Sequence, residues 1–205
     1  MRSDEMDRPR TFTEEARRAQ IMRCAIEALA ELGFSGSSLA EIARRAGVSK
    51  GVVSYYFAGK DELLGQVLFD VYARAGAAIA ERIGHANDPA VVIRGYLEAN
   101  LSFLAENLAD IRAVVEIAAN ARSPDGSLRF AVPGEDPVLA HLQSLLQAGK
   151  DTGRFGEVDS RSMAVLIRGA IDTASGRLVG DPAFDLEAYT RQLVDVVDLA
   201  LRPAT

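Results

Sequence analysis

Side chains suited to contact nucleic acid follow one another in the stretch KGVVSYY, which begins at residue 50. Lys50 can donate a hydrogen bond to guanine or to a phosphate, and the methyl groups of Val52 can meet the methyl group of thymine. Ser54 and Tyr55 can hydrogen-bond to bases or phosphates through their hydroxyl groups. Gly51 has no side chain, so the backbone there can approach a ligand closely. On one face of a short helix, these groups could enter a DNA major groove.

Two short helices joined by a tight turn would place that face outward. The first helix is indicated by apolar residues with helical spacing, namely Leu39, Ile42, Ala43 and Ala46. Gly47 follows at the position where a helix commonly ends in a left-handed residue. Ser49 can cap the second helix, in which Val53 and Phe57 are predicted to point inward.

A longer helix is predicted upstream of these two. Thr13 is followed by two glutamates, which is typical of a helix start, and Gly33 is expected to end the helix. Its inward face is predicted to contain Met22, Ala25, Leu29 and Leu32. Ser38 and Glu41 have the spacing of a capping box for the next helix. The three helices together predict one small shared core.

The chain resembles the N-terminal DNA-binding domain of TetR-family transcriptional regulators in the stretch GFSGSSLAEIARRAGVSKGVVSYYFAGKDELL, Gly33 to Leu64. Three runs carry the resemblance in the family's order and spacing: G-F-x-x-x-S-L-x-x-I-A, A-G-V-S-K-G and Y-Y-F-x-x-K-x-x-L-L. The resemblance extends from about Thr13 to about Leu68. Within the family, this stretch is most similar to the choline–betaine branch.

The resemblance implies a set of DNA-contacting residues. Base edges and nearby sugar or phosphate groups would be contacted by Lys50, Gly51, Val52, Ser54 and Tyr55. The phosphate backbone would be held by Ser38, Tyr56 and Lys60. One reading helix offers too few contacts for specificity against a genome. We therefore expect a twofold homodimer on a palindromic operator in double-stranded DNA.

Composition limits the class of protein. The chain has 205 residues, of which 48% are hydrophobic and 25% are charged. Residues 1–60 hold ten Lys and Arg and eight Asp and Glu, whereas residues 61–205 hold thirteen and twenty-one, so a basic end precedes an acidic body. The sequence has no run of about 18 apolar residues, so no membrane span is expected. With Cys24 as the only cysteine and no apolar leader, the chain is expected to be cytoplasmic.

The remaining residues are predicted to form a larger helical domain. Helices are expected at about 60–83, 89–107, 110–121, 137–149, 159–178 and 186–201, and residues 122–136 are rich in turn formers. No strand is predicted, so the fold class is all-α. The predicted domains are a flexible arm at 1–10, a helix-turn-helix DNA-binding domain at 11–60, and a ligand-binding and dimerisation domain at 61–205.

In the family, the last two helices build a four-helix bundle between subunits, which implies a homodimer through the same helices here. Their apolar stripes contain Ala164, Leu166, Ile167, Ala170, Ile171, Ala174, Leu193, Val196, Val197 and Leu201. These stripes could instead form internal core. A small-molecule effector would lie among the preceding helices, and its candidate contacts are Tyr96, Asn100, Phe103, Glu116, His141, Arg168 and Asp172. Arg168 and Asp172 could instead pair with each other, because they are four residues apart.

The resemblance implies a repressor that a small molecule releases from its operator, by shifting the helix that is tied to the DNA-binding domain at Lys60. One alternative is a DNA-binding regulator controlled by a protein partner, which the acidic body permits. A helical enzyme is disfavoured, because His85, His141 and Cys24 lack metal-ligand spacing and no nucleotide-binding or nucleophile motif appears in a suitable context. No cofactor or metal is expected.

Overall fold

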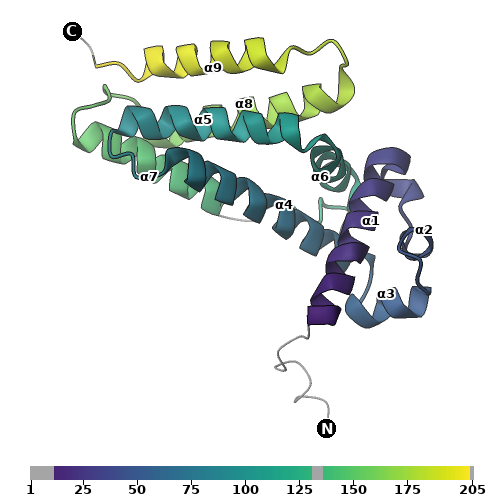
Figure 1. Ribbon diagram of the computed structural model, residues 1–205. Coiled ribbons are helices and arrows are strands. Elements are labelled where there is room, and N and C mark those ends of the chain that lie inside the picture. The colour runs from purple at the N-terminus through teal and green to yellow at the C-terminus, as the bar shows by residue number, and fades with distance from the viewer. Residues whose placement is uncertain (1–11, 131–135, 204–205) are drawn as a thin grey trace.

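The computed structural model describes residues 12–130 and 136–203 (Figure 1). The helices in these ranges are α1 (Phe12–Gly36), α2 (Leu39–Arg45), α3 (Lys50–Tyr56), α4 (Lys60–Ile83), α5 (Pro89–Glu106), α6 (Leu108–Asn120), α7 (Pro137–Asp151), α8 (Ser160–Gly180) and α9 (Leu186–Ala200). The described ranges contain no strand, only an isolated bridge between Arg122 and Leu128. The all-α prediction is confirmed, whereas the arm expected at 1–10 lies outside the described residues.

The first three helices form a separate unit at one end of the molecule (Figure 1). We call α1–α3 the head and the part from α4 onward the body. From the head, α4 runs into the body, in which α5, α8 and α9 lie lengthwise (Figure 1). Between the two parts, α6 packs against α1. The end of the body opposite the head holds the start of α5 and the end of α9.

A small apolar core holds the head together. It contains Ile21 and Leu29 from α1, Ile42 from α2, Val53 from α3, and Phe57, each at most 1% exposed. The inward positions predicted for Val53 and Phe57 are therefore confirmed. Full burial of one such side chain contributes about 1.5–3 kcal/mol, so these few side chains can hold α2 and α3 against α1.

The prediction for Leu32 is wrong. Its side chain is 48% exposed, although Leu29, one turn earlier, is fully buried. Directly after Leu32, Gly33 has a φ of 68° and a ψ of −178°, which is not helical geometry. The inward stripe of α1 ends at Leu29 because the chain changes direction before another core-facing turn is complete.

Each short helix of the head begins at a serine cap. The hydroxyl of Ser38 accepts a hydrogen bond from the backbone N–H of Glu41 at 3.2 Å, and that of Ser49 accepts from Val52 at 3.3 Å. Between the two helices, Gly47 has a φ of 65°. Both predicted caps and the left-handed turn are confirmed. A hydroxyl cap contributes about 1 kcal/mol, which is a large share of the stability of helices as short as these.

One described helix, α4, is long and apolar enough to cross a membrane when only length and composition are considered. The expectation of no membrane span rested on a different criterion, an uninterrupted apolar run of about 18 residues, which Asp70 and Arg74 break in this helix. A core helix meets the test of length and composition equally well, and the first half of α4 buries Leu63, Leu64, Val67, Leu68 and Val71 inside the molecule. These residues join the core of the head to the body.

The apolar stripes of α8 and α9 lie largely inside the body. Six of the residues expected at a dimer contact are buried there: Ala164, Ile167, Ile171, Ala174, Val197 and Leu201. The expectation that these six contact a second chain is wrong, because each amphipathic helix uses this stripe for the monomer's own core. In contrast, Leu166 and Val196 are 65% and 51% exposed.

Replacing Gly47 with valine is expected to destabilise the head by about 1–3 kcal/mol, because a β-branched residue at positive φ is strained. An added Cβ would meet nothing within 4 Å, so the cost is conformational and not steric crowding. Thermal unfolding measures the loss. Gly47→Asn is the matched control, since asparagine tolerates this backbone conformation, and a valine variant as stable as the asparagine variant would refute the assignment.

Candidate nucleic-acid interface

The outer face of α3 presents the residues expected to read DNA. Lys50, Gly51 and Ser54 are exposed, and the exposed fractions of Val52 and Tyr55 are 36% and 75%. Behind them, Val53 is completely buried in the core of the head. The helix is thus fixed from one side, and its cationic, hydroxyl and methyl groups face solvent together on the other.

Tyr56 connects the outer face to the core. Its ring is half-buried and meets the ring of Tyr55 edge-on, with centroids 5.1 Å apart and an interplanar angle of 88°. Its backbone carbonyl accepts a hydrogen bond from Arg18 Nη1 of α1 at 2.7 Å. The end of α3 is therefore fastened to α1, and Tyr56 positions Tyr55 as well as offering its own hydroxyl group.

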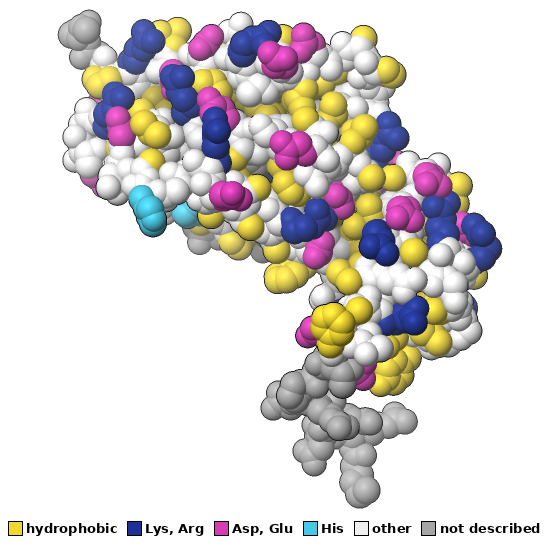
Figure 2. Space-filling model, in the orientation of Figure 1, with side chains coloured by type: hydrophobic (Ala, Val, Ile, Leu, Met, Phe, Trp, Pro, Cys, Tyr) yellow, Lys and Arg dark blue, Asp and Glu magenta, His cyan; other side chains and the backbone are white. Residues whose placement is uncertain are grey.

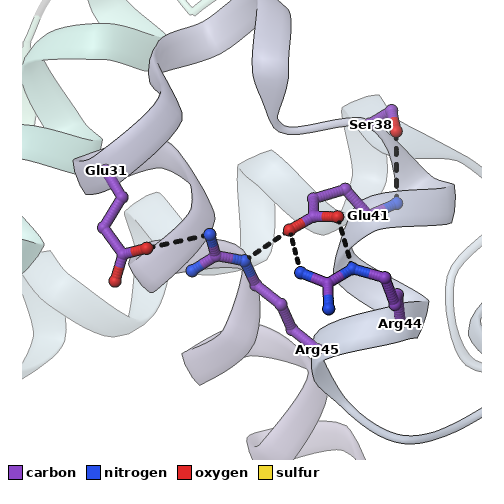
Figure 3. Close-up of polar contacts among 5 residues, drawn as sticks. All are labelled: Glu31, Ser38, Glu41, Arg44 and Arg45. Atoms are coloured by element: carbon purple, nitrogen blue, oxygen red, sulfur yellow. Dashed lines mark hydrogen bonds and ion pairs between the residues drawn. The ribbon is translucent and has the colours of Figure 1, made fainter.

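An ionic cluster fastens α2 to α1 (Figure 3). The Glu41 carboxylate accepts from Arg44 Nε and Nη2 and from Arg45 Nε, each at 2.8 Å. Arg45 also reaches Glu31 of α1 at 2.8 Å. Because Glu41 turns to these arginines, only the serine half of the predicted capping box forms. The hydrogen bonds from Arg44 and Arg45 hold the pKa of Glu41 at about 2.

Lys60, at the start of α4, points into the molecule at Phe34. Its ammonium group donates to the Phe34 carbonyl at 2.7 Å and lies 4.1 Å from the centre of the Phe34 ring. Burial lowers the pKa of Lys60. An ammonium group has three N–H donors, so a phosphate contact here would use the donors that Phe34 leaves available. Residue spacing could not predict this contact, because Phe34 lies 26 residues away along the chain.

Glu116, expected to touch an effector, lies instead at the junction of head and body. Its carboxylate accepts the backbone N–H of Phe34 at 2.9 Å and the side-chain N–H of Asn120 at 3.2 Å. This acceptor sits beside Gly33, where the chain leaves helical geometry. Glu116 of α6 thereby holds the end of α1.

Three of the other expected effector contacts come together between α5 and α8. Tyr96 is buried, and its hydroxyl interacts electrostatically with Arg168 and Asp172. Arg168 pairs with Asp172 at 3.1 Å, as the alternative allowed, and its guanidinium also lies 6.0 Å from the ring centre of Tyr72 on α4. Burial raises the pKa of Tyr96. Tyr72 was not predicted as a contact of this group, because no periodic pattern in the sequence marks an exposed residue of α4.

The last three expected contacts lie at the edge of this group or away from it. Asn100 donates to the backbone carbonyl of Tyr96 at 2.7 Å and so borders the group. Phe103 is buried in the core shared with the head, near Arg74. His141 is exposed on α7. Spacing along an apolar helix did not distinguish these environments.

Comparison with known proteins agrees with this geometry. Residues 21–67 match the family model described as "Bacterial regulatory proteins, tetR family". The HTH-type transcriptional regulator BetI of Burkholderia thailandensis is 29% identical over 95% of this chain and 98% of its own length. BetI of Burkholderia ambifaria is 36% identical over 45% of this chain and 48% of its own length.

Solved structures share the fold over nearly the whole chain. The fatty acid degradation regulator FadR of Bacillus halodurans has a TM-score of 0.77 at 22% identity and covers 96% of this chain and 100% of its own. FadR of Bacillus subtilis, solved in complex with stearoyl-CoA, has a TM-score of 0.72 at 21% identity and covers 90% of this chain and 99% of its own.

An exposed reading helix on a buried three-helix core is the architecture of a helix-turn-helix transcriptional regulator. The relatives are named as regulators of this type, which bind DNA and are not enzymes, and the same class is assigned to this chain. Residues 21–67 match the TetR family, and nearly the whole chain shares the fold of TetR-family regulators.

The ionic cluster predicts a specific pH dependence. The pKa of Glu41 is about 2 in the folded chain, against an ordinary value of 4.5. Because the folded value is the lower one, the stabilisation is complete above the ordinary value and is lost as pH falls toward 2. We expect Glu41→Gln to be less stable than wild type at neutral pH, with the difference shrinking through this range.

Urea unfolding at a series of pH values, with an NMR titration of the Glu41 carboxyl group, measures the effect. A Glu41 midpoint near its ordinary value, or a stability difference that does not change with pH, would show that the cluster does not hold in solution.

Proposed function

We propose that this TetR-family regulator is a cytoplasmic repressor that binds a palindromic operator as a homodimer and is released by a small-molecule effector. The observation that supports the proposal most strongly is the outward set of cationic, hydroxyl and methyl groups on α3, fixed by the buried core behind it. Repression, dimerisation and effector release each rest on further features of the body.

DNA contact is proposed for the residues that the resemblance indicated. Lys50, Gly51, Val52, Ser54 and Tyr55 lie where base edges would be read. Phosphate contacts are proposed for Ser38, Tyr56 and Lys60. The Ser38 oxygen accepts the cap hydrogen bond, so its hydroxyl hydrogen is available to donate to a phosphate oxygen.

Dimerisation is proposed through the outward faces of α8 and α9. Leu166 of α8 and Val196 and Leu199 of α9 are large, apolar and exposed. A side chain added at Gly169 would meet nothing within 4 Å, so a helix of a second chain could approach α8 closely there. An exposed apolar face on two neighbouring helices is typical of a protein contact surface.

The effector site is proposed between α4, α5 and α8, at Tyr72, Tyr96, Asn100, Arg168 and Asp172. The Arg168 side chain is only 22% exposed, pairs with Asp172 at 3.1 Å and lies 6.0 Å from the ring centre of Tyr72. Buried polar groups within a mostly apolar surround are typical of small-molecule sites. A bound stearoyl-CoA in the similar fold of Bacillus subtilis FadR supports an effector of this kind.

Two helices can carry a change at this site to the head. Tyr72 lies on α4, whose first residue, Lys60, binds Phe34 at 2.7 Å. Through Glu116, α6 binds the same residue at 2.9 Å. A shift of either helix would therefore move the end of α1 and alter the spacing of two heads on an operator. Typical couplings of about 1–3 kcal/mol would change operator affinity roughly 5–150-fold.

Selection of bound sequences from random DNA fragments tests the proposal. We expect a twofold-symmetric site with half-sites about one helical turn apart, bound by two chains. Analytical ultracentrifugation and electrophoretic mobility measure the number of chains. A strictly monomeric protein, or equal affinity for symmetric and scrambled sequences, would contradict the proposal.

Two substitutions separate phosphate contacts from base contacts. Lys60→Ala is expected to weaken binding to all sequences about equally and to lower the slope of log affinity against log salt by about one. Val52→Ala is expected to relax the preference at one base position and to leave the slope unchanged. Fluorescence anisotropy over a salt series measures both effects. Lys150→Ala, in the body, is the matched control and should resemble wild type.

The junction makes a further prediction that needs no effector. Glu116→Ala removes the acceptor for the Phe34 N–H, so amide hydrogen exchange at Phe34 should become about tenfold faster or more. Glu116→Gln keeps an oxygen acceptor and should remain closer to wild type, and Glu81→Ala, an exposed acid on α4, should have no effect. Unchanged exchange at Phe34 in the alanine variant would exclude Glu116 as the connection between α6 and the head.

A further inference from the structure

A second site lies at the end of the body opposite the head, where a pocket of about 360 Å³ opens between the start of α5, the end of α9 and the turn after α7. Its lining includes Arg94, Arg154 and Arg202 but only one acid, Asp198. Over this end of the body, basic, acidic and apolar side chains lie next to one another (Figure 2). The pocket is thus positively charged within a body that is acidic overall.

The arginines of this distal pocket retain hydrogen-bond donors. Arg94 donates to Asp198 through Nη2, and Arg154 donates to Asp88 through Nε at 2.9 Å. A guanidinium group has five N–H donors, and each pair engages one nitrogen. Among the described residues, the Arg202 side chain has no hydrogen bond or ion pair. The acids therefore orient two arginines and leave most of their N–H groups available.

The opposite wall of the pocket is apolar and firmly held. It contains Val91, Phe155 and Leu201. A Cβ at Gly149 would lie 2.0 Å from the Phe155 ring, so the ring sits directly against the α7 backbone. The next residue, Gly156, donates its N–H to the Leu201 carbonyl at 2.9 Å, which ties the turn to the end of α9. An apolar surface is thereby fixed beside the charged one.

We propose that this distal pocket binds a small amphipathic anion. Its carboxylate or phosphate group would accept hydrogen bonds from the arginines, and its apolar group would pack against Phe155 and Val91. Arginine recognises both kinds of anion through paired N–H donors. The pocket volume is within the usual range for small-molecule sites, about 300–1,000 Å³. Three guanidinium groups exclude a cation. This site is separate from the proposed effector site at Arg168 and does not depend on it.

Calorimetric titration of the full chain with phenyl phosphate and with benzoate tests the proposal and separates the two anionic groups. At least one of them should bind saturably, once per chain. Inorganic phosphate lacks the ring, and benzyl alcohol lacks the charge. Each should bind at least about tenfold more weakly, because it keeps only the polar or only the apolar part of the contact. Phenyltrimethylammonium, a cation of similar size, should not bind.

Two variants locate the bound probe. Arg202→Ala removes donors, and Val91→Asp places a negative charge in the pocket, so each should weaken binding about tenfold or more. Both positions are exposed, and an acid in the first turn of α5 favours the helix, so both variants should fold, as thermal unfolding will check. Arg112→Ala, an exposed arginine on α6, and Arg168→Ala, in the effector site, should bind as wild type does.

Three results would overturn the assignment: no saturable binding of either ring-bearing anion, binding that both pocket variants leave unchanged, or binding that only Arg168→Ala removes. The last result would place the probe in the effector site.

Discussion

The position of the head depends on how the backbone of Phe34 is held. Its N–H is bound by Glu116 from α6 at 2.9 Å, and its carbonyl is bound by Lys60 from α4 at 2.7 Å. The preceding Gly33 makes this possible, because its φ of 68°, which favours glycine, turns the chain at this point. Three helices that are distant in sequence therefore meet at the backbone of one residue, Phe34. The orientation of the head relative to the body follows from that geometry.

The head itself is stabilised by two different kinds of interaction. Its interior is apolar and closely packed around Leu29, Ile42 and Phe57. On its surface, charge-assisted hydrogen bonds from Arg45 connect Glu31 of α1 to Glu41 of α2. Exposed ion pairs are usually weak individually, but a shared network holds its members in a single geometry. The apolar interior and the surface ion pairs together fix the orientation of α3, because α2 and α3 pack on the same core.

The sequence was sufficient to predict the turn and the caps of the two short helices in the head, because these features are governed by local rules. The serine caps, the left-handed Gly47 and the inward Val53 each follow from residue type and spacing. The environment of Glu116 could not be found in this way, since it depends on a residue 82 positions away. Six residues of the apolar stripes of α8 and α9 are covered by the chain itself, whereas Leu166 and Val196 of the same stripes are exposed. Periodicity shows which side of a helix avoids water, and it does not show whether the covering surface belongs to the same chain.

The ionic cluster on α2 affects how the protein would meet DNA that lacks its operator. Arg44 directs its guanidinium group at Glu41, and Arg45 directs its own at Glu41 and Glu31. Affinity for arbitrary duplexes grows with the number of phosphates that are neutralised and counterions that are released. Because these arginines are engaged with acids of the head, their contribution to the affinity for DNA that lacks the operator would be small. Fewer copies would then be held on sequences other than the operator.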